Sequence, residues 1–170
     1  MEKLTQDLIE APGFSSLFQT DERESADSNQ DIELEVVNPD SYNLSYTCLL
    51  IPRFPSHQLK GDLADYLHQW LPQICISYSW RLEFITIQPD YFQWAICVPP
   101  STIRGHFMQQ IRYDTSEMIF SNFGHIRSEN LSNDFWAPGN LVVLGTRPHP
   151  EEMISQYIHL IRIQQGLNKL

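Results

Sequence analysis

The stretch FITIQPDYFQWAICVPP, residues 84–100, constrains the fold of this chain more than any other. Residues 79–87 and 92–98 are short runs rich in β-branched and aromatic side chains, and the Pro-Asp pair at 89–90 between them favours a tight turn. Two such runs predict an antiparallel β-hairpin. A lone hairpin is marginally stable in water, so the chain must extend it into a sheet and cover it with other elements.

The remaining apolar patterns supply those elements. Residues 44–52 and 140–147 are two further apolar runs that predict strands. Helical spacing of apolar residues predicts helices at 58–75, from a cap at Ser101 or Thr102 to about Phe123, and from Pro150 to a stop at Gly166. Pro72 should end or kink the first of these helices. The order βαββαβα predicts an α+β fold, an antiparallel four-stranded sheet packed with helices.

Acidic charge is concentrated at the start of the chain. The whole sequence carries a formal net charge of −10, and residues 1–41 hold eleven acidic and two basic residues. Residues 42–170 are therefore close to neutral. The stretch TDERESADSNQDIELE has little to bury, which is typical of disorder. We expect a largely disordered acidic tail, 1–41, and one folded domain, 42–170.

The positions of the cysteines and glycines indicate which cellular compartment and which cofactors to expect. Cys48, Cys75 and Cys97 lie far apart in apolar segments without metal-ligand spacing, so buried free thiols in a reducing compartment are expected. No apolar run is long enough for a membrane span, and no glycine-rich phosphate loop is present. The sequence therefore predicts a cytoplasmic protein with no cofactor and no membrane partner.

Four stretches, in order, resemble one known family. They are YNLSYTCLLIPRF, QPDYFQWAICVPP, FMQQIRYDTSEMIFSNF and FWAPGNLVVLGTRPHPEEMISQYIHLI, and together they run from about Tyr42 to Gln165. The pattern is similar to IS200-like (TnpA) transposases, the small one-tyrosine members of the HUH superfamily, which bind hairpins of single-stranded DNA and cut them. The resemblance implies a ferredoxin-like-related HUH transposase fold.

The resemblance also implies where a catalytic site would be. In the family, two histidines and a glutamine hold a divalent cation, and a tyrosine attacks phosphorus. The histidine positions here are Tyr91 and Gln93, the glutamine position is Ile161, and only the tyrosine, Tyr157, is retained. A phenol and an amide oxygen are poor substitutes for imidazoles, and an alkyl chain has no donor atom. We therefore expect these positions to be vestigial, Tyr157 to be a buried core aromatic, and the protein to be no enzyme.

Possible nucleic-acid contacts come from basic and aromatic side chains. The candidates are Arg53, Lys60, Arg104, Arg112, Trp136 and Arg147. Trp136, in a loop, is expected to be the most exposed tryptophan and could stack on a base. The basic residues are spread along a nearly neutral domain beside an acidic tail, which is a weak electrostatic basis for binding DNA.

Two functions of different classes therefore remain open. The first is a non-catalytic, domesticated transposase-like protein that acts as a protein-interaction or regulatory subunit, with the 1–41 tail as a docking arm for an unidentified protein. The second is a single-stranded or hairpin nucleic-acid-binding protein that has lost DNA cleavage. Charge and the replaced ligands favour the first, and family descent favours the second. The resemblance further implies a homodimer, for which the apolar 140–145 strand suits edge pairing.

Overall fold

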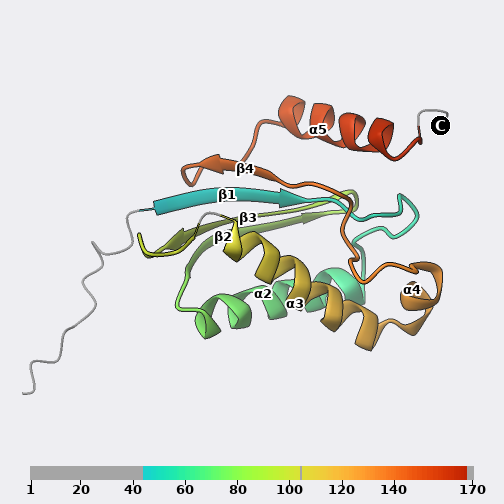
Figure 1. The fold of residues 1–170 in the computed structure, drawn as a ribbon, viewed down its shortest axis with the longest axis horizontal. Helices are drawn as coiled ribbons and strands as arrows, with labels where there is room; N and C mark the ends of the chain where they lie inside the picture. Colours follow the sequence, from blue (N-terminus) through green and yellow to red (C-terminus); the bar gives the residue numbers. More distant parts are fainter. Residues whose placement is uncertain (1–43, 104, 168–170) are drawn as a thin grey trace, which may run out of the picture. The chain divides into compact units, whose positions relative to one another are not determined.

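The computed structural model describes residues 44–103 and 105–167, so the acidic segment 1–41 lies outside the described residues. The elements are β1 (Leu44–Leu50), α2 (Asp62–Ser77), β2 (Arg81–Gln88), β3 (Tyr91–Val98), α3 (His106–Asn122), α4 (Gly124–Glu129), β4 (Leu141–Leu144) and α5 (Glu151–Gln164). The four strands form one sheet, which confirms the predicted α+β class (Figure 1).

The sheet is antiparallel throughout, in the order β2-β3-β1-β4. Gln88 pairs with Tyr91, so only two residues turn the predicted hairpin of β2 and β3. The first strand of the chain then lies between β3 and β4. As a result, β1 and β3 are the central strands, and the short β4 is an edge.

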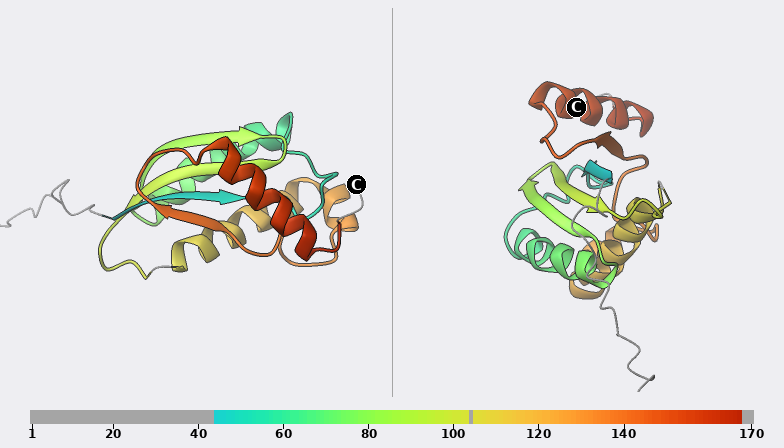
Figure 2. Two further views of the ribbon diagram at one scale, coloured as in Figure 1. Left: turned by 90° about the horizontal axis from the view of Figure 1, so that it is seen from above. Right: turned by 90° about the vertical axis from the view of Figure 1, so that its left-hand side faces the viewer.

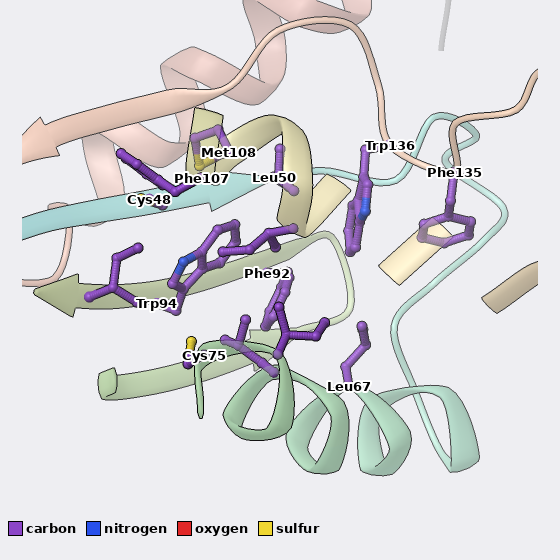
Figure 3. Packing of buried hydrophobic residues seen from close by; sticks show 14 of the residues in the cluster. Cys48, Leu50, Leu67, Cys75, Phe92, Trp94, Phe107, Met108, Phe135 and Trp136 are labelled. Carbon is purple, nitrogen blue, oxygen red and sulfur yellow. The ribbon is translucent and has the colours of Figure 1, made fainter. Parts of the chain in front are cut away.

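The two faces of the sheet carry different cores. Phe92, Trp94 and Ile96 are fully buried on the face covered by α2 and α3, and Figure 3 shows Phe92 and Trp94 with Leu67 of α2 in this cluster. Because side chains alternate along a strand, Tyr91 and Gln93 point to the opposite face. Helix α5 crosses the sheet on that opposite face (Figure 2).

A second, smaller core fixes α5 to the sheet. Its buried members are Leu49, Ile51, Ala137, Ile154 and Ile161, and Tyr91, Leu141, Tyr157 and Ile158 are partly buried against it. One apolar side of α5 is therefore buried, as the helical spacing predicted. The packing places Tyr157 between the helix and the 137–141 segment.

Two predicted helix boundaries are wrong, and one short helix was not predicted. Helix α2 does not end at Pro72 but continues to Ser77. The carbonyl four residues before Pro72 belongs to the exposed His68, where water can replace the missing hydrogen bond. Helix α3 begins only after Gly105 rather than at a cap on Ser101 or Thr102, and Ile103 before it is 80% exposed. The segment 124–129 forms the short helix α4, which the sequence pattern did not predict.

The cysteines are buried and free, as predicted. Burial raises the pKa of Cys75 to about 12 and raises the pKa of Cys48 further. Both thiols are therefore protonated and unreactive at neutral pH. Within the described residues, no helix has both the length and the apolar character that a membrane span requires.

Candidate functional site

A cleft lies between the β2–β3 turn and the first turns of α5, where the resemblance places the family's first metal ligand. Its volume is about 420 Å³. It is lined by Gln88, Pro89, Asp90, Tyr91, Glu151, Ile154, Ser155 and Ile158. The hairpin thus supplies one wall and α5 the other, so this cleft is the candidate site.

The cleft is electrically negative. Asp90 and Glu151 contribute carboxylates. Partial burial, and secondarily the charge of Glu151, raise the pKa of Tyr91, so its phenol is neutral at pH 7. Burial lowers the pKa of Arg162 on α5, although the carboxylate of Asp90 opposes this effect. A phosphate group entering the cleft would meet repulsion rather than a prepared cation.

Gln93 faces α5 but does not present its amide to the cleft. Its side chain is buried, and its Oε1 accepts a hydrogen bond from the backbone N–H of His149 at 2.7 Å. The same oxygen lies 2.8 Å from Nδ1 of His149. The amide oxygen is therefore already used within the protein, just before α5 begins.

The described residues do not fit the divalent cation that the family implies. Tyr91 offers a neutral phenol, Gln93 is engaged by His149, and Ile161 is a buried alkyl chain. Across 44–103 and 105–167, no three or more His, Cys, Asp or Glu side chains are grouped so that they could hold a metal ion. No chemical step through a metal ion follows from this arrangement.

Tyr157 lies on the half-buried side of α5, against Gly139. A Cβ atom placed on Gly139 would lie 3.5 Å from the Tyr157 hydroxyl and 3.4 Å from Cδ1 of Ile161. Burial raises the pKa of Tyr157 to about 12, and the positive charge of Arg112 acts in the opposite direction. The phenol is thus neutral at pH 7, in the apolar surroundings expected for a core aromatic.

Arg112 of α3 organises the loop under Tyr157. Its guanidinium pairs with the carboxylate of Asp134. It also donates hydrogen bonds to the carbonyl oxygens of Gly139 at 2.7 Å, Ala137 at 2.9 Å and Trp136 at 3.3 Å. One partly buried guanidinium therefore binds four residues of the 134–139 segment, and few of its N–H groups remain for binding phosphate.

The other proposed basic contacts with nucleic acid differ in how exposed they are. Arg53 is partly buried, with Nε donating to the carbonyl oxygen of Asp134 at 2.9 Å. Lys60 and Arg147 are exposed. Arg104 lies outside the described residues. Among the candidates with described structure, only Lys60 and Arg147 are thus placed to meet phosphate freely.

The expected exposure of Trp136 is wrong. Its side chain is fully buried, its ring stacks on Phe92 with centroids 5.6 Å apart, and its Nε1 donates to Oγ1 of Thr115 at 2.8 Å. Trp136 also pairs with Pro52 in an isolated β-bridge, so its loop is drawn against the end of β1. It cannot stack on a base without unfolding this segment.

Sequence reasoning missed the partners that define the site. His149, Asp134 and Gly139 were not among the candidates, and each acts on a residue distant in sequence. The contact between His149 and Gln93 spans 56 positions. No periodicity or motif in the sequence connects such pairs. The only signal near His149 was Pro150, which predicted the start of a helix.

Comparisons with known proteins follow this geometry. The model of the family described as "Transposase IS200 like" matches residues 40–160. A crystal structure of a presumed transposase from Deinococcus radiodurans R1 is 22% identical, with a TM-score of 0.62, covering 69% of this chain and 90% of that one. A REP-associated tyrosine transposase bound to a REP hairpin is 11% identical, with a TM-score of 0.45, covering 73% and 69%, and is too distant to support an argument. No curated protein sequence matches.

These comparisons overturn one prediction from the sequence. The replacements at Tyr91, Gln93 and Ile161 led us to expect that the protein is no enzyme. The family whose model matches residues 40–160 consists of transposases, which are enzymes. Replaced side chains at the family's ligand positions do not by themselves show that activity is lost. The expectation that the protein is not an enzyme is therefore withdrawn.

Proposed function

The chain belongs to the family of IS200-like transposases, and we propose that it binds folded single-stranded DNA as a two-fold homodimer. The observation that carries the proposal is the extent of the family match, residues 40–160, which includes all four strands of the sheet and most of α5. A shared fold does not by itself determine function, so the proposal depends on a dimer surface and on exposed cations.

The edge strand β4 supports a homodimer through residues 140–145. Val143 and Leu144 are 41% and 62% exposed on this strand. An edge strand also carries unpaired backbone N–H and C=O groups, and antiparallel pairing with a second copy satisfies them. Beside the end of β4 lies a further cleft of about 570 Å³, which extends to Met153 and offers additional apolar surface to a partner subunit.

Arg147 is the cation best placed to contact phosphate in such a dimer. It is exposed and lines the cleft beside β4. In a two-fold dimer with antiparallel β4 strands, one copy of Arg147 lies at each end of the paired strands. Each phosphate contact releases counterions, so binding must weaken as salt rises.

A second function is favoured by the charge of residues 1–41, whose eleven acidic and two basic residues complement a basic protein partner. In this alternative the segment is a docking arm for a protein partner. A pulldown with the full chain and with residues 42–170 tests it, and recovery of the same partner by both would exclude the docking arm.

The free buried thiols favour a reducing compartment and support a cytoplasmic location.

The DNA-binding proposal is tested with a fluorescent hairpin oligonucleotide and the full chain. Arg147→Gln should weaken binding several-fold and reduce the dependence of log K on log salt, by about 0.7 for each phosphate that the variant fails to neutralise. The matched control is Arg127→Gln, an equal change of charge on α4, at the other end of the sheet (Figure 1). Equal effects of both substitutions would mean that Arg147 makes no localised contact.

A further inference from the structure

We propose that Gln93 and His149 form a latch that fastens the start of α5 to the sheet, and that this latch takes the place of a divalent cation. The position that the family resemblance assigns to a metal ligand is thus used here to fix a helix. The proposal concerns the described residues alone and does not depend on DNA binding.

The backbone hydrogen bond settles which atom of Gln93 faces His149. A backbone N–H is only a donor, so the atom 2.7 Å from it must be the amide oxygen rather than the amide nitrogen. The same oxygen lies 2.8 Å from Nδ1 of His149, so Nδ1 must carry a hydrogen. In the latch, the backbone N–H and the ring Nδ1–H of His149 therefore both donate to the amide oxygen of Gln93.

The latch is buried at a rigid place in the sheet. Gln93 is 3% exposed and His149 is 6% exposed. Gln93 pairs with Leu49 of β1 on one side and with Thr86 of β2 on the other, so its backbone is held by two neighbouring strands. His149 immediately precedes Pro150, the N-cap residue of α5. Fixing His149 therefore fixes where the helix starts.

The other end of α5 is fastened as well. Nη1 of Arg162 and Nε2 of Gln165 both donate to the carbonyl oxygen of Arg53, at 3.1 Å and 2.9 Å. Between the two ends, Ile154 and Ile161 are buried in the second core. Polar attachments at both ends and apolar packing between them hold Tyr157 against Gly139.

A metal ion would have to break the latch. To turn its oxygen toward a cation, Gln93 would have to release both donors of His149. Those donors would then be buried without an acceptor, which is unfavourable. In addition, Nε2 of His149 is buried with no hydrogen-bond partner, so the ring offers no lone pair at an accessible surface. The latch and a metal ion at Gln93 therefore exclude each other.

Hydrogen exchange and a metal titration of the full chain test the proposal. Gln93→Leu should raise amide exchange across residues 151–164 at least about tenfold, while β1 and β3 stay protected. The matched control, Gln88→Leu, removes an exposed amide of β2 that makes no contact with His149, and it should leave exchange in α5 unchanged. If Gln93→Leu does not fold, His149→Leu removes the ring hydrogen bond alone and should give a smaller rise in the same segment.

Calorimetry with manganese chloride alone provides the second arm. The unaltered chain should release or absorb no binding heat, and its melting temperature should be the same with and without manganese. Unchanged exchange of α5 in the variants would overturn the latch. Stoichiometric manganese binding that disappears in Gln93→Leu would overturn the exclusion of a metal ion.

Discussion

Replacing Gly139 with alanine should destabilise the protein through the backbone rather than through a clash. Gly139 has φ +87°, a left-handed conformation that costs a residue with a side chain about 1–2 kcal/mol. The added Cβ would lie 3.4 Å from Ile161 and 3.5 Å from the Tyr157 hydroxyl, and these are ordinary contacts that add little strain. The expected loss in the free energy of unfolding is therefore about 1–2 kcal/mol.

Urea unfolding followed by tryptophan fluorescence measures this loss, because Trp136 lies in the same segment. The control is Gly124→Ala, at the first position of α4, where φ is not left-handed and no atom lies within 4 Å of an added Cβ. This control should be neutral or stabilising by up to about 1 kcal/mol. A loss below about 0.3 kcal/mol for Gly139→Ala, or equal losses for both variants, would refute the described loop conformation.

Three further predictions use the same assays. Arg112→Met should lower the free energy of unfolding by about 3 kcal/mol, because it leaves Asp134 and three carbonyl oxygens without their donor. Urea unfolding measures this loss, and a value below about 1 kcal/mol would contradict the prediction. Burial lowers the pKa of His149, so the stability that the neutral ring contributes is complete above about pH 6.5 and is lost as pH falls toward the folded pKa. The urea midpoint should therefore decrease from pH 7.5 to 6.5 and again to 5.5. In His149→Leu the decrease should be smaller. If the proposed dimer forms through β4, Leu144→Lys should give a monomer in sedimentation, whereas Leu131→Lys, at a site that is 94% exposed, should sediment like the unaltered chain.

Local patterns were sufficient for the sheet and for its two faces. The strand predicted at 92–98 is present as β3, and its two-residue period explains why Tyr91 and Gln93 lie opposite Phe92 and Trp94. The helical spacing of 150–165 likewise predicted which side of α5 is buried.

Tertiary contacts were beyond the reach of such patterns. Trp136 was expected to be exposed because it precedes Pro138-Gly139, but Thr115 and Phe92, both distant in sequence, bury it. Gln93 was evaluated only as a failed metal ligand, whereas its partner His149 comes from another segment. Periodicity shows which side chains lie on each face of one helix or strand. It does not show which residue from a distant part of the sequence will contact them.

The central claim, that this family member binds folded single-stranded DNA, is tested most directly by a salt titration of the full chain. Fluorescence anisotropy with a hairpin that has single-stranded flanks should show saturable binding. With about four phosphate contacts, affinity should fall about 50-fold between 50 and 200 mM salt. A blunt duplex of equal length should bind at least about tenfold more weakly. Absence of binding to the hairpin at 50 mM salt, or equal affinity for the two DNAs, would contradict the account.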